Sequence, residues 1–178
     1  MSRNPIAPVC ALFLATAVSQ VAAQPPDAPV DSRLRPSFHL TVEEAAARIG
    51  EPACGRILTD FRDVAGRPLT TRLEATGLDA SAYVRSVAFR VGRGVGRCQS
   101  KRFLMVTTIM GPVVWVCEAQ YYRKERDEPE VAVALVIHEV LHTLGLGEDP
   151  PTSEEITAQV LARCSATAPA SRVALIAR

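Results

Sequence analysis

The sequence predicts a single α+β domain, in which a short, mostly antiparallel sheet packs on a central helix and a further helix follows at the C-terminus. Three observations predict this class. The chain has 178 residues, of which 48% are hydrophobic, enough for one core of ordinary size. Runs of β-branched and apolar residues fill the middle of the chain, between residues 83 and 117. A nearly all-apolar helical segment over 131–146 and an amphipathic one over 153–164 come after them.

The first 23 residues have the layout of a secretory signal peptide. One basic residue, Arg3, precedes a mainly apolar stretch over 8–18, and small residues at 21–23 come just before Gln24. We therefore expect cleavage after Ala23 and a secreted or periplasmic protein. The apolar stretch is much shorter than the roughly 20 residues that span a bilayer, so no stable membrane anchoring is expected.

The mature chain, residues 24–178, would carry 19 basic and 19 acidic side chains, because the signal peptide removes only Arg3. A net charge of zero argues against a dedicated nucleic-acid-binding protein. The ordinary hydrophobic content argues against a disordered chain. The composition therefore favours a neutral exported domain.

Residues 24–37 contain four prolines and predict an extended linker, so the folded domain is expected over 38–178. Thr41 lies three residues before Glu44, which is the capping-box arrangement. It predicts a first helix at about 42–49, ended by Gly50. The signals between residues 54 and 82 are mixed and predict no definite element.

Three strands are expected in the middle of the chain, over 83–91, 103–110 and 113–117. Glycines at 92, 94 and 96 predict a hairpin loop after the first strand. This loop and its flanks are basic, and we interpret them as a solvated face whose charges are balanced by acids elsewhere rather than as an anion site. The basic residues are Arg85, Arg90, Arg93, Arg97, Lys101 and Arg102.

Four cysteines remain after export, and an even number in an oxidising compartment predicts two disulfides. Four cysteines permit three pairings. We favour Cys98 with Cys117, which would join neighbouring strands, and Cys54 with Cys164, which would attach the last helix to the early part of the domain. A zinc site made of all four cysteines is the alternative, but no two of them have the close spacing that such sites favour.

The most informative segment begins at Pro129, which marks the start of a helix. This apolar helix contains His138, Glu139 and His142. Residues four apart lie on one face, one turn apart, so the two imidazoles can bind one Zn²⁺. Glu139 is placed to reach a water on the metal without binding the metal itself.

This His-Glu-x-x-His pattern resembles that of the zincin metallopeptidases, and the likeness is specific only over about residues 129–156. Gly145 matches the glycine of the metzincin extension, and Glu148 occupies the third-ligand position, where metzincins have histidine or aspartate. A glutamate there departs from that branch, but a carboxylate oxygen is an acceptable zinc ligand. No methionine follows Met110, so the methionine turn of metzincins is missing. In the gluzincin branch a glutamate on the next helix is the third ligand, which makes Glu154 the second candidate. Asp149 is the third.

The resemblance implies a small zincin-like domain, a Zn²⁺ cofactor and hydrolysis of peptide bonds in a peptide or protein substrate. Zinc would polarise the scissile carbonyl, with Glu139 as general base. An edge strand over 103–110 or 113–117 would hold the substrate, and Tyr121 or Tyr122 is a weaker candidate for a donor to the oxyanion. Two alternatives stay open: an exported zinc-binding or interaction protein without turnover, and a hydrolase of non-peptide amides in the cell wall.

Overall fold

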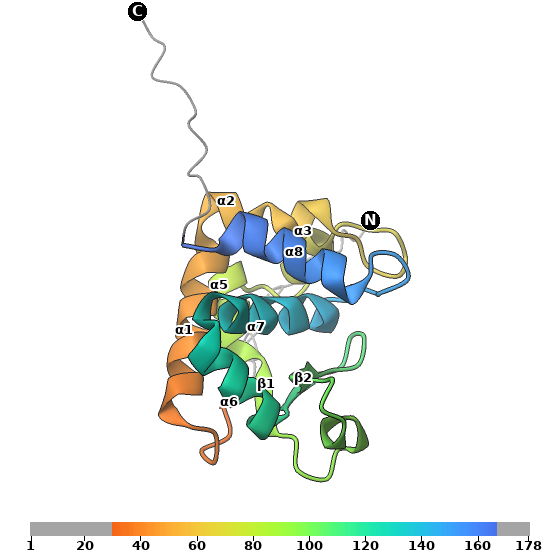
Figure 1. Ribbon diagram of the computed structural model, residues 1–178. Helices are drawn as coiled ribbons and strands as arrows, with labels where there is room; N and C mark the ends of the chain where they lie inside the picture. Colours follow the sequence, from red (N-terminus) through yellow and green to blue (C-terminus); the bar gives the residue numbers. More distant parts are fainter. Residues whose placement is uncertain (1–29, 167–178) are drawn as a thin grey trace, which may run out of the picture.

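The computed structural model describes residues 30–166, and these form an α+β domain, as predicted (Figure 1). The expected signal peptide, 1–23, lies outside the described residues. No helix within the described part of the chain is both long and apolar enough to cross a membrane. The elements, in chain order, are α1 (Pro36–Gly50), α2 (Pro52–Gly55), α3 (Ile57–Asp60), α4 (Leu69–Glu74), α5 (Ala80–Ser86), β1 (Ala88–Val91), η1 (Gly96–Gln99), β2 (Met105–Val106), β3 (Val113–Val116), α6 (Glu118–Asp127), α7 (Pro129–Thr143) and α8 (Ser153–Cys164).

Helix α7 is the centre of the domain, as its apolar sequence predicts. It contacts α1, α6, α8 and strands β2 and β3, and Figure 1 shows α8 on one side of it and the sheet on the other. Proline near its first position and buried residues on nearly every turn explain its start and its place in the core. The amphipathic α8 spans Ser153–Cys164, as predicted, and the capping box of Thr152 and Glu155 is present.

The sheet is mixed, so the prediction of a mostly antiparallel sheet is wrong in its pairing. Its strand order is β1-β3-β2, with β1 parallel and β2 antiparallel to β3. The predicted strand over 83–91 begins only at Ala88, because Asp79 caps helix α5 by accepting a hydrogen bond from Ala82 N–H. The strand expected over 103–110 is only two residues long. Since β3 lies between β1 and β2, the glycine-rich loop does not form a hairpin between them.

The first helix begins earlier than predicted, at Pro36. Thr41 is buried inside it, and its hydroxyl donates to the Ser37 carbonyl instead of capping the helix. Leu34 is buried as well, so the end of the predicted linker belongs to the domain. Proline at the first helical position, where no N–H partner is needed, explains the earlier start.

Helix α6 is absent from the prediction, and it carries both tyrosines. Tyr121 and Tyr122 are buried, and the Tyr121 ring packs edge-on against Phe38. The Tyr122 hydroxyl accepts a hydrogen bond from Arg35 N–H at 2.8 Å. Both are packing residues of the core.

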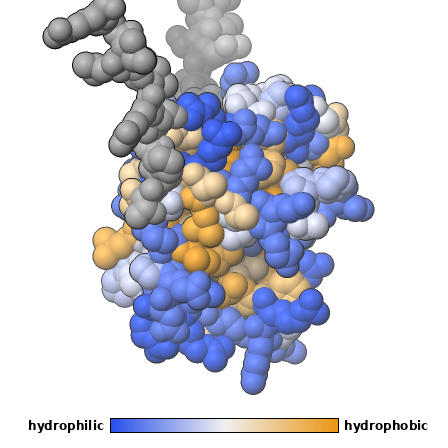
Figure 2. All heavy atoms as spheres, turned by 45° about the horizontal axis from the view of Figure 1, so that its top comes forward, coloured by the Kyte–Doolittle hydropathy of each residue, from blue (hydrophilic) through white to orange (hydrophobic). Residues whose placement is uncertain are grey.

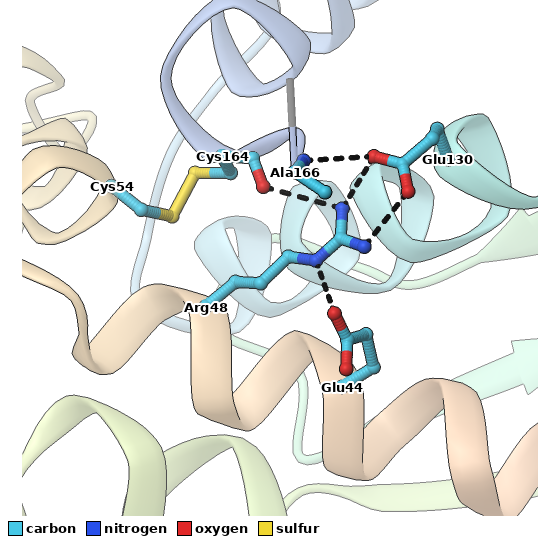
Figure 3. The surroundings of a disulfide bond; sticks show 6 residues. All are labelled: Glu44, Arg48, Cys54, Glu130, Cys164 and Ala166. Carbon is cyan, nitrogen blue, oxygen red and sulfur yellow. Dashed lines mark hydrogen bonds and ion pairs between the residues drawn. A yellow bond between two sulfur atoms is a disulfide. The ribbon is translucent and has the colours of Figure 1, made fainter. Parts of the chain in front are cut away.

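Both predicted disulfides are present, Cys54–Cys164 and Cys98–Cys117. They fit an extracellular environment. Beside Cys54–Cys164 the Arg48 guanidinium joins three segments: it donates to Glu44, to the Glu130 carboxylate and to the Cys164 carbonyl (Figure 3). The disulfide and Arg48 together attach the end of α8 to α1 and to the start of α7.

Apolar side chains gather in a band on one face of the molecule, with hydrophilic side chains around it (Figure 2). Several large apolar residues are exposed in the described chain, and three of them lie near one another in space or sequence: Val64, Ile109 and Met110. A side chain at Gly147 would touch both Val64 and Ile109. These residues therefore border the loop that follows α7.

Candidate functional site

The last two turns of α7 bring two imidazoles together. His138 and His142 are four residues apart on the buried side of the helix, and their Nε2 atoms lie 2.9 Å apart. Two ring nitrogens that face each other across such a short distance present their lone pairs to one point. The predicted pairing of these residues is therefore present.

The loop after α7 adds a carboxylate to the pair. Glu148 Oε1 lies 3.2 Å from His142 Nε2 and 3.4 Å from His138 Nε2. The chain reverses at Gly145, whose φ is +104°, and a Cβ there would lie 3.1 Å from that of Asp63. Both the backbone conformation and the lack of space require glycine, which is the role that the sequence pattern implies for it.

Each imidazole is held through its other ring nitrogen. His142 Nδ1 lies 2.8 Å from the Leu146 carbonyl, and His138 Nδ1 lies 2.9 Å from the Thr157 hydroxyl of α8. A carbonyl only accepts, so His142 Nδ1 carries the hydrogen and the Nε2 of the neutral ring is left with a free lone pair. Such partners orient the histidine ligands of metal sites and set their tautomer.

Electrostatics favours a neutral His138 imidazole and an ionised Glu148. Burial, followed by the charge of His142, holds the pKa of His138 below its ordinary value. Burial would raise the pKa of Glu148, but the two histidines and a hydrogen bond from Ser153 together hold it below its ordinary value. Neutral imidazoles beside a carboxylate are the protonation states in which these groups bind a metal.

Glu139 is buried beside this cluster but does not belong to it. Burial, and then the charge of Glu148, raise the pKa of Glu139 to about 8. The backbone N–H of Thr107, just after β2, donates to its carboxylate. Helix α7 thus directs Glu139 toward the sheet, while His138 and His142 on another face of the helix point at Glu148.

The loop that contains Asp63 and Val64 hydrogen-bonds to the loop after α7, which carries Gly145, Leu146 and Glu148. Asp63 pairs with Leu146 in an isolated β-bridge, and Val64 N–H donates to the Gly145 carbonyl at 3.0 Å. The Asp63 side chain is fully buried, with Arg67 and Arg72 on its carboxylate. Hydrogen bonds from the Arg67 backbone, and then from both guanidiniums, hold the pKa of Asp63 well below its ordinary value. This ionised carboxylate fixes the segment that carries the Leu146 carbonyl.

One cavity of about 640 Å³ opens onto the two histidines, Glu139 and Glu148. Its walls include His138, Glu139, His142 and Glu148 on one side and residues 102–109, which contain β2, on the other. Glu154 also lines it, whereas Asp149 does not. The cavity therefore combines a cluster of metal-binding atoms, a buried carboxylate and an edge strand.

The structure separates the candidate third ligands. Within residues 30–166, the group of donor atoms close enough to hold one ion is His138, His142 and Glu148, without Glu154 or Asp149. Tyr121 and Tyr122 do not line the cavity, so neither is an oxyanion donor. The sequence reasoning missed Thr157 and Asp63, because no spacing pattern connects a residue of another helix or loop to the histidines.

The donor set fits a divalent transition metal. In tetrahedral zinc sites, nitrogen and oxygen ligands at about 2.0–2.1 Å from the ion lie about 3.3 Å from one another. The three donor–donor distances here are 2.9, 3.2 and 3.4 Å. Two imidazoles and a carboxylate suit zinc and several neighbouring metals, so this group could hold a metal ion, and its geometry does not select one.

In comparisons with known proteins, the chain matched no family model, no curated protein and no solved structure.

Proposed function

We propose that this protein is an exported zinc-dependent peptidase, in which His138, His142 and Glu148 hold the metal and Glu139 is the general base. The observation that carries the proposal is the position of Glu139: a buried carboxylate in the same cavity as the three donors, but outside their cluster. A site that only holds a metal does not need this fourth group, whose burial is unfavourable.

The residues have distinct roles in the proposed reaction. The bound zinc would supply Lewis-acid chemistry to a substrate carbonyl and to water. Glu139 would take the proton of the attacking water and return it to the leaving nitrogen. Burial raises the pKa of Glu139 above its ordinary value, which makes its carboxylate a better proton acceptor, and the Thr107 N–H orients it.

The cavity wall supports a peptide as the substrate. Strand β2 is at the edge of the sheet, because its only neighbour in the strand order is β3. An extended peptide can add to such an edge through main-chain hydrogen bonds. Of the two strands that the sequence offered, the segment around β2 lines the cavity.

Export is part of the proposal because of the disulfides. Cys54–Cys164 joins residues 110 positions apart and Cys98–Cys117 joins residues 19 apart. Such bonds persist in oxidising compartments. Together with the signal-like N-terminus, they support a secreted or periplasmic location.

The test measures metal content and turnover on the same sample. The protein is expressed with export to an oxidising compartment, and hydrolysis of casein and of a mixture of quenched peptides is followed before chelation, after it and after zinc is restored. We expect one zinc per chain and hydrolysis that disappears and returns with the metal. One bound zinc without hydrolysis of any substrate would instead support the second candidate, a zinc-binding protein without turnover.

Paired variants test the third ligand. Glu148→Ala should lower zinc affinity at least about 100-fold, because it removes a ligand. Glu154→Ala is the matched control, since Glu154 lines the same cavity without being part of the donor cluster. Loss of zinc in Glu154→Ala but not in Glu148→Ala would contradict the assignment.

A further inference from the structure

Two arginines on the wall of the cavity have no acidic partner within the part of the chain that the structure describes. Arg97 and Arg102 line the same cavity as the metal-binding cluster. Neither forms an ion pair with a carboxylate of residues 30–166, and both are exposed. Arg97 instead lies over the Phe103 ring, 5.8 Å from its centroid. Two uncompensated guanidiniums in a cleft attract anionic groups.

The other basic residues of this region differ from this pair. Arg85 pairs with Glu43, and Arg93 pairs with Glu118 at 3.1 Å. For these two, the interpretation of a solvated face balanced by acids is confirmed. Lys101 has no acid partner within residues 30–166 either, but it lines another hollow on the surface. Arg97 and Arg102 are thus distinguished by both their missing acids and their place on the cleft.

The backbone segment that contains Arg97 and Arg102 is held by a disulfide and by side-chain hydrogen bonds. Cys98, next to Arg97, is bonded to Cys117 at the end of β3. Gln120 of α6 donates through its side-chain amide to the carbonyls of Cys98 and Ser100, at 3.3 and 3.2 Å. The backbone that carries the arginines is therefore attached to the sheet and to α6 independently of any ligand.

Both arginines precede the edge strand β2 in the chain: Arg97 belongs to η1, and Arg102 lies in the turn before β2. Thr107, which contacts Glu139, is five residues after Arg102. Five fully extended residues would span roughly 16 Å, so Arg102 lies within that distance of Thr107, at most several residues of a peptide along β2. The opposite wall carries Glu148 and Glu154, so the two sides of the cleft have opposite charge.

We propose that the cleft selects peptides with an acidic side chain several residues to one side of the bond that is cleaved, and that Arg97 and Arg102 are the specificity-determining residues. The proposal rests on the proposed function, because it concerns the same cleft. It assigns recognition to side-chain carboxylates, whose planar geometry suits paired guanidinium N–H groups.

The test uses matched quenched peptides of one core sequence. A block of three glutamates, or of three glutamines as the neutral control, is placed on the N-terminal or the C-terminal side of the core. We expect wild-type kcat/KM to favour glutamate over glutamine about three- to tenfold on one side only, because two partly exposed ion pairs contribute modestly. Raising the salt concentration should reduce this preference.

The double variant Arg97→Gln, Arg102→Gln should bring the ratio of kcat/KM for the glutamate peptide to that for the glutamine peptide to about one. Arg93→Gln is the control, because Arg93 belongs to the same basic loop but pairs with Glu118 and lines a different hollow. A ratio that is unchanged in the double variant, or equal on both sides in the wild type, would overturn the proposal and leave the peptidase assignment intact.

A binding measurement separates this proposal from the proposed function. Fluorescein-labelled forms of the same peptides are titrated with zinc-loaded Glu139→Gln protein, and anisotropy is measured. If no peptide is hydrolysed by the wild type, the peptidase assignment fails. Tighter binding of the glutamate peptide that depends on Arg97 and Arg102 would still support the acidic-ligand cleft, and equal binding of both peptides would overturn it.

Discussion

At the amino end of α7, the Glu130 carboxylate accepts hydrogen bonds from two nitrogens of Arg48 at 2.6 and 2.9 Å and from the Ala166 N–H at 3.1 Å (Figure 3). At the carboxyl end of the same helix, Glu139 is more deeply buried and receives one backbone hydrogen bond. The first glutamate has a depressed pKa and the second a raised one. Helix α7 thus contains one carboxylate with three hydrogen bonds, Glu130, and one with a single hydrogen bond, Glu139.

This contrast shows how stability and chemistry are divided along the helix. Arg48 of α1 joins the amino end to the end of α8, and the buried Cys54–Cys164 disulfide next to it joins α8 to α2. At the carboxyl end His138, Glu139 and His142 are polar side chains buried in the core, which costs stability. Such groups are typical of functional sites, and the rest of the fold must hold them in place. The two ends should therefore respond differently to the same substitution.

The largest expected effect is on turnover at the carboxyl end. Glu139→Gln should lower kcat about 100- to 10,000-fold, because it removes the proposed general base. Zinc content and melting temperature should stay near wild type, since the amide occupies the same space. Glu130→Gln, the same change at the other end, should keep kcat within a few-fold. Equal losses of kcat in both variants would remove the functional distinction between the two ends.

The next effect is on stability at the amino end. Replacing Cys54 and Cys164 together with alanine should lower the free energy of unfolding by about 4–5 kcal/mol, because the bond closes a long loop of the unfolded chain. The shorter Cys98–Cys117 loop should contribute about 3 kcal/mol. Urea denaturation of both double variants measures the difference. A larger loss in the Cys98–Cys117 variant would contradict the loop-length argument.

A smaller effect is expected from the hydroxyl that orients His138. Thr157→Val keeps the shape of the side chain but removes the contact to Nδ1, so zinc affinity should fall about 10- to 100-fold. Thr157→Ser retains the hydroxyl and should bind zinc nearly as tightly as wild type. Competition with a chromogenic chelator measures both affinities. The same zinc affinity in the valine and serine variants would show that the hydroxyl does not orient the ligand.

The smallest effect is the pH dependence of the amino end. Hydrogen bonds from Arg48 depress the folded-state pKa of Glu130 below 4.5, so its contribution to stability is complete above that pH and is lost as the pH falls through the folded-state value. Glu130→Gln should remove about 1 kcal/mol at neutral pH. Its unfolding free energy should approach that of wild type in acid. A constant difference from neutral pH down into the acid range would contradict this linkage.

Local patterns predicted much of the fold and part of the site. The start of α7 at Pro129 and the capping box of α8 depend on neighbouring residues, and both are present. The length of the first strand was overestimated, because the Asp79 cap favours helix α5 over a pattern that also suits a strand. Helix α6 was missed, since its apolar face consists mainly of Tyr121 and Tyr122, which suit strands equally well.

The sequence alone predicted that His138 and His142 lie together, because the period of an α-helix places residues four apart on one face, and it assigned Glu139 a separate role beside them. Packing in three dimensions selected Glu148 from among the candidate acids, through the turn at Gly145 and the loop of Asp63 beneath it. Packing also placed Thr157 on His138 and brought Arg97 and Arg102 to the same cleft. Contacts between distant segments follow from how the helices and loops pack together, and no periodicity along the chain records them.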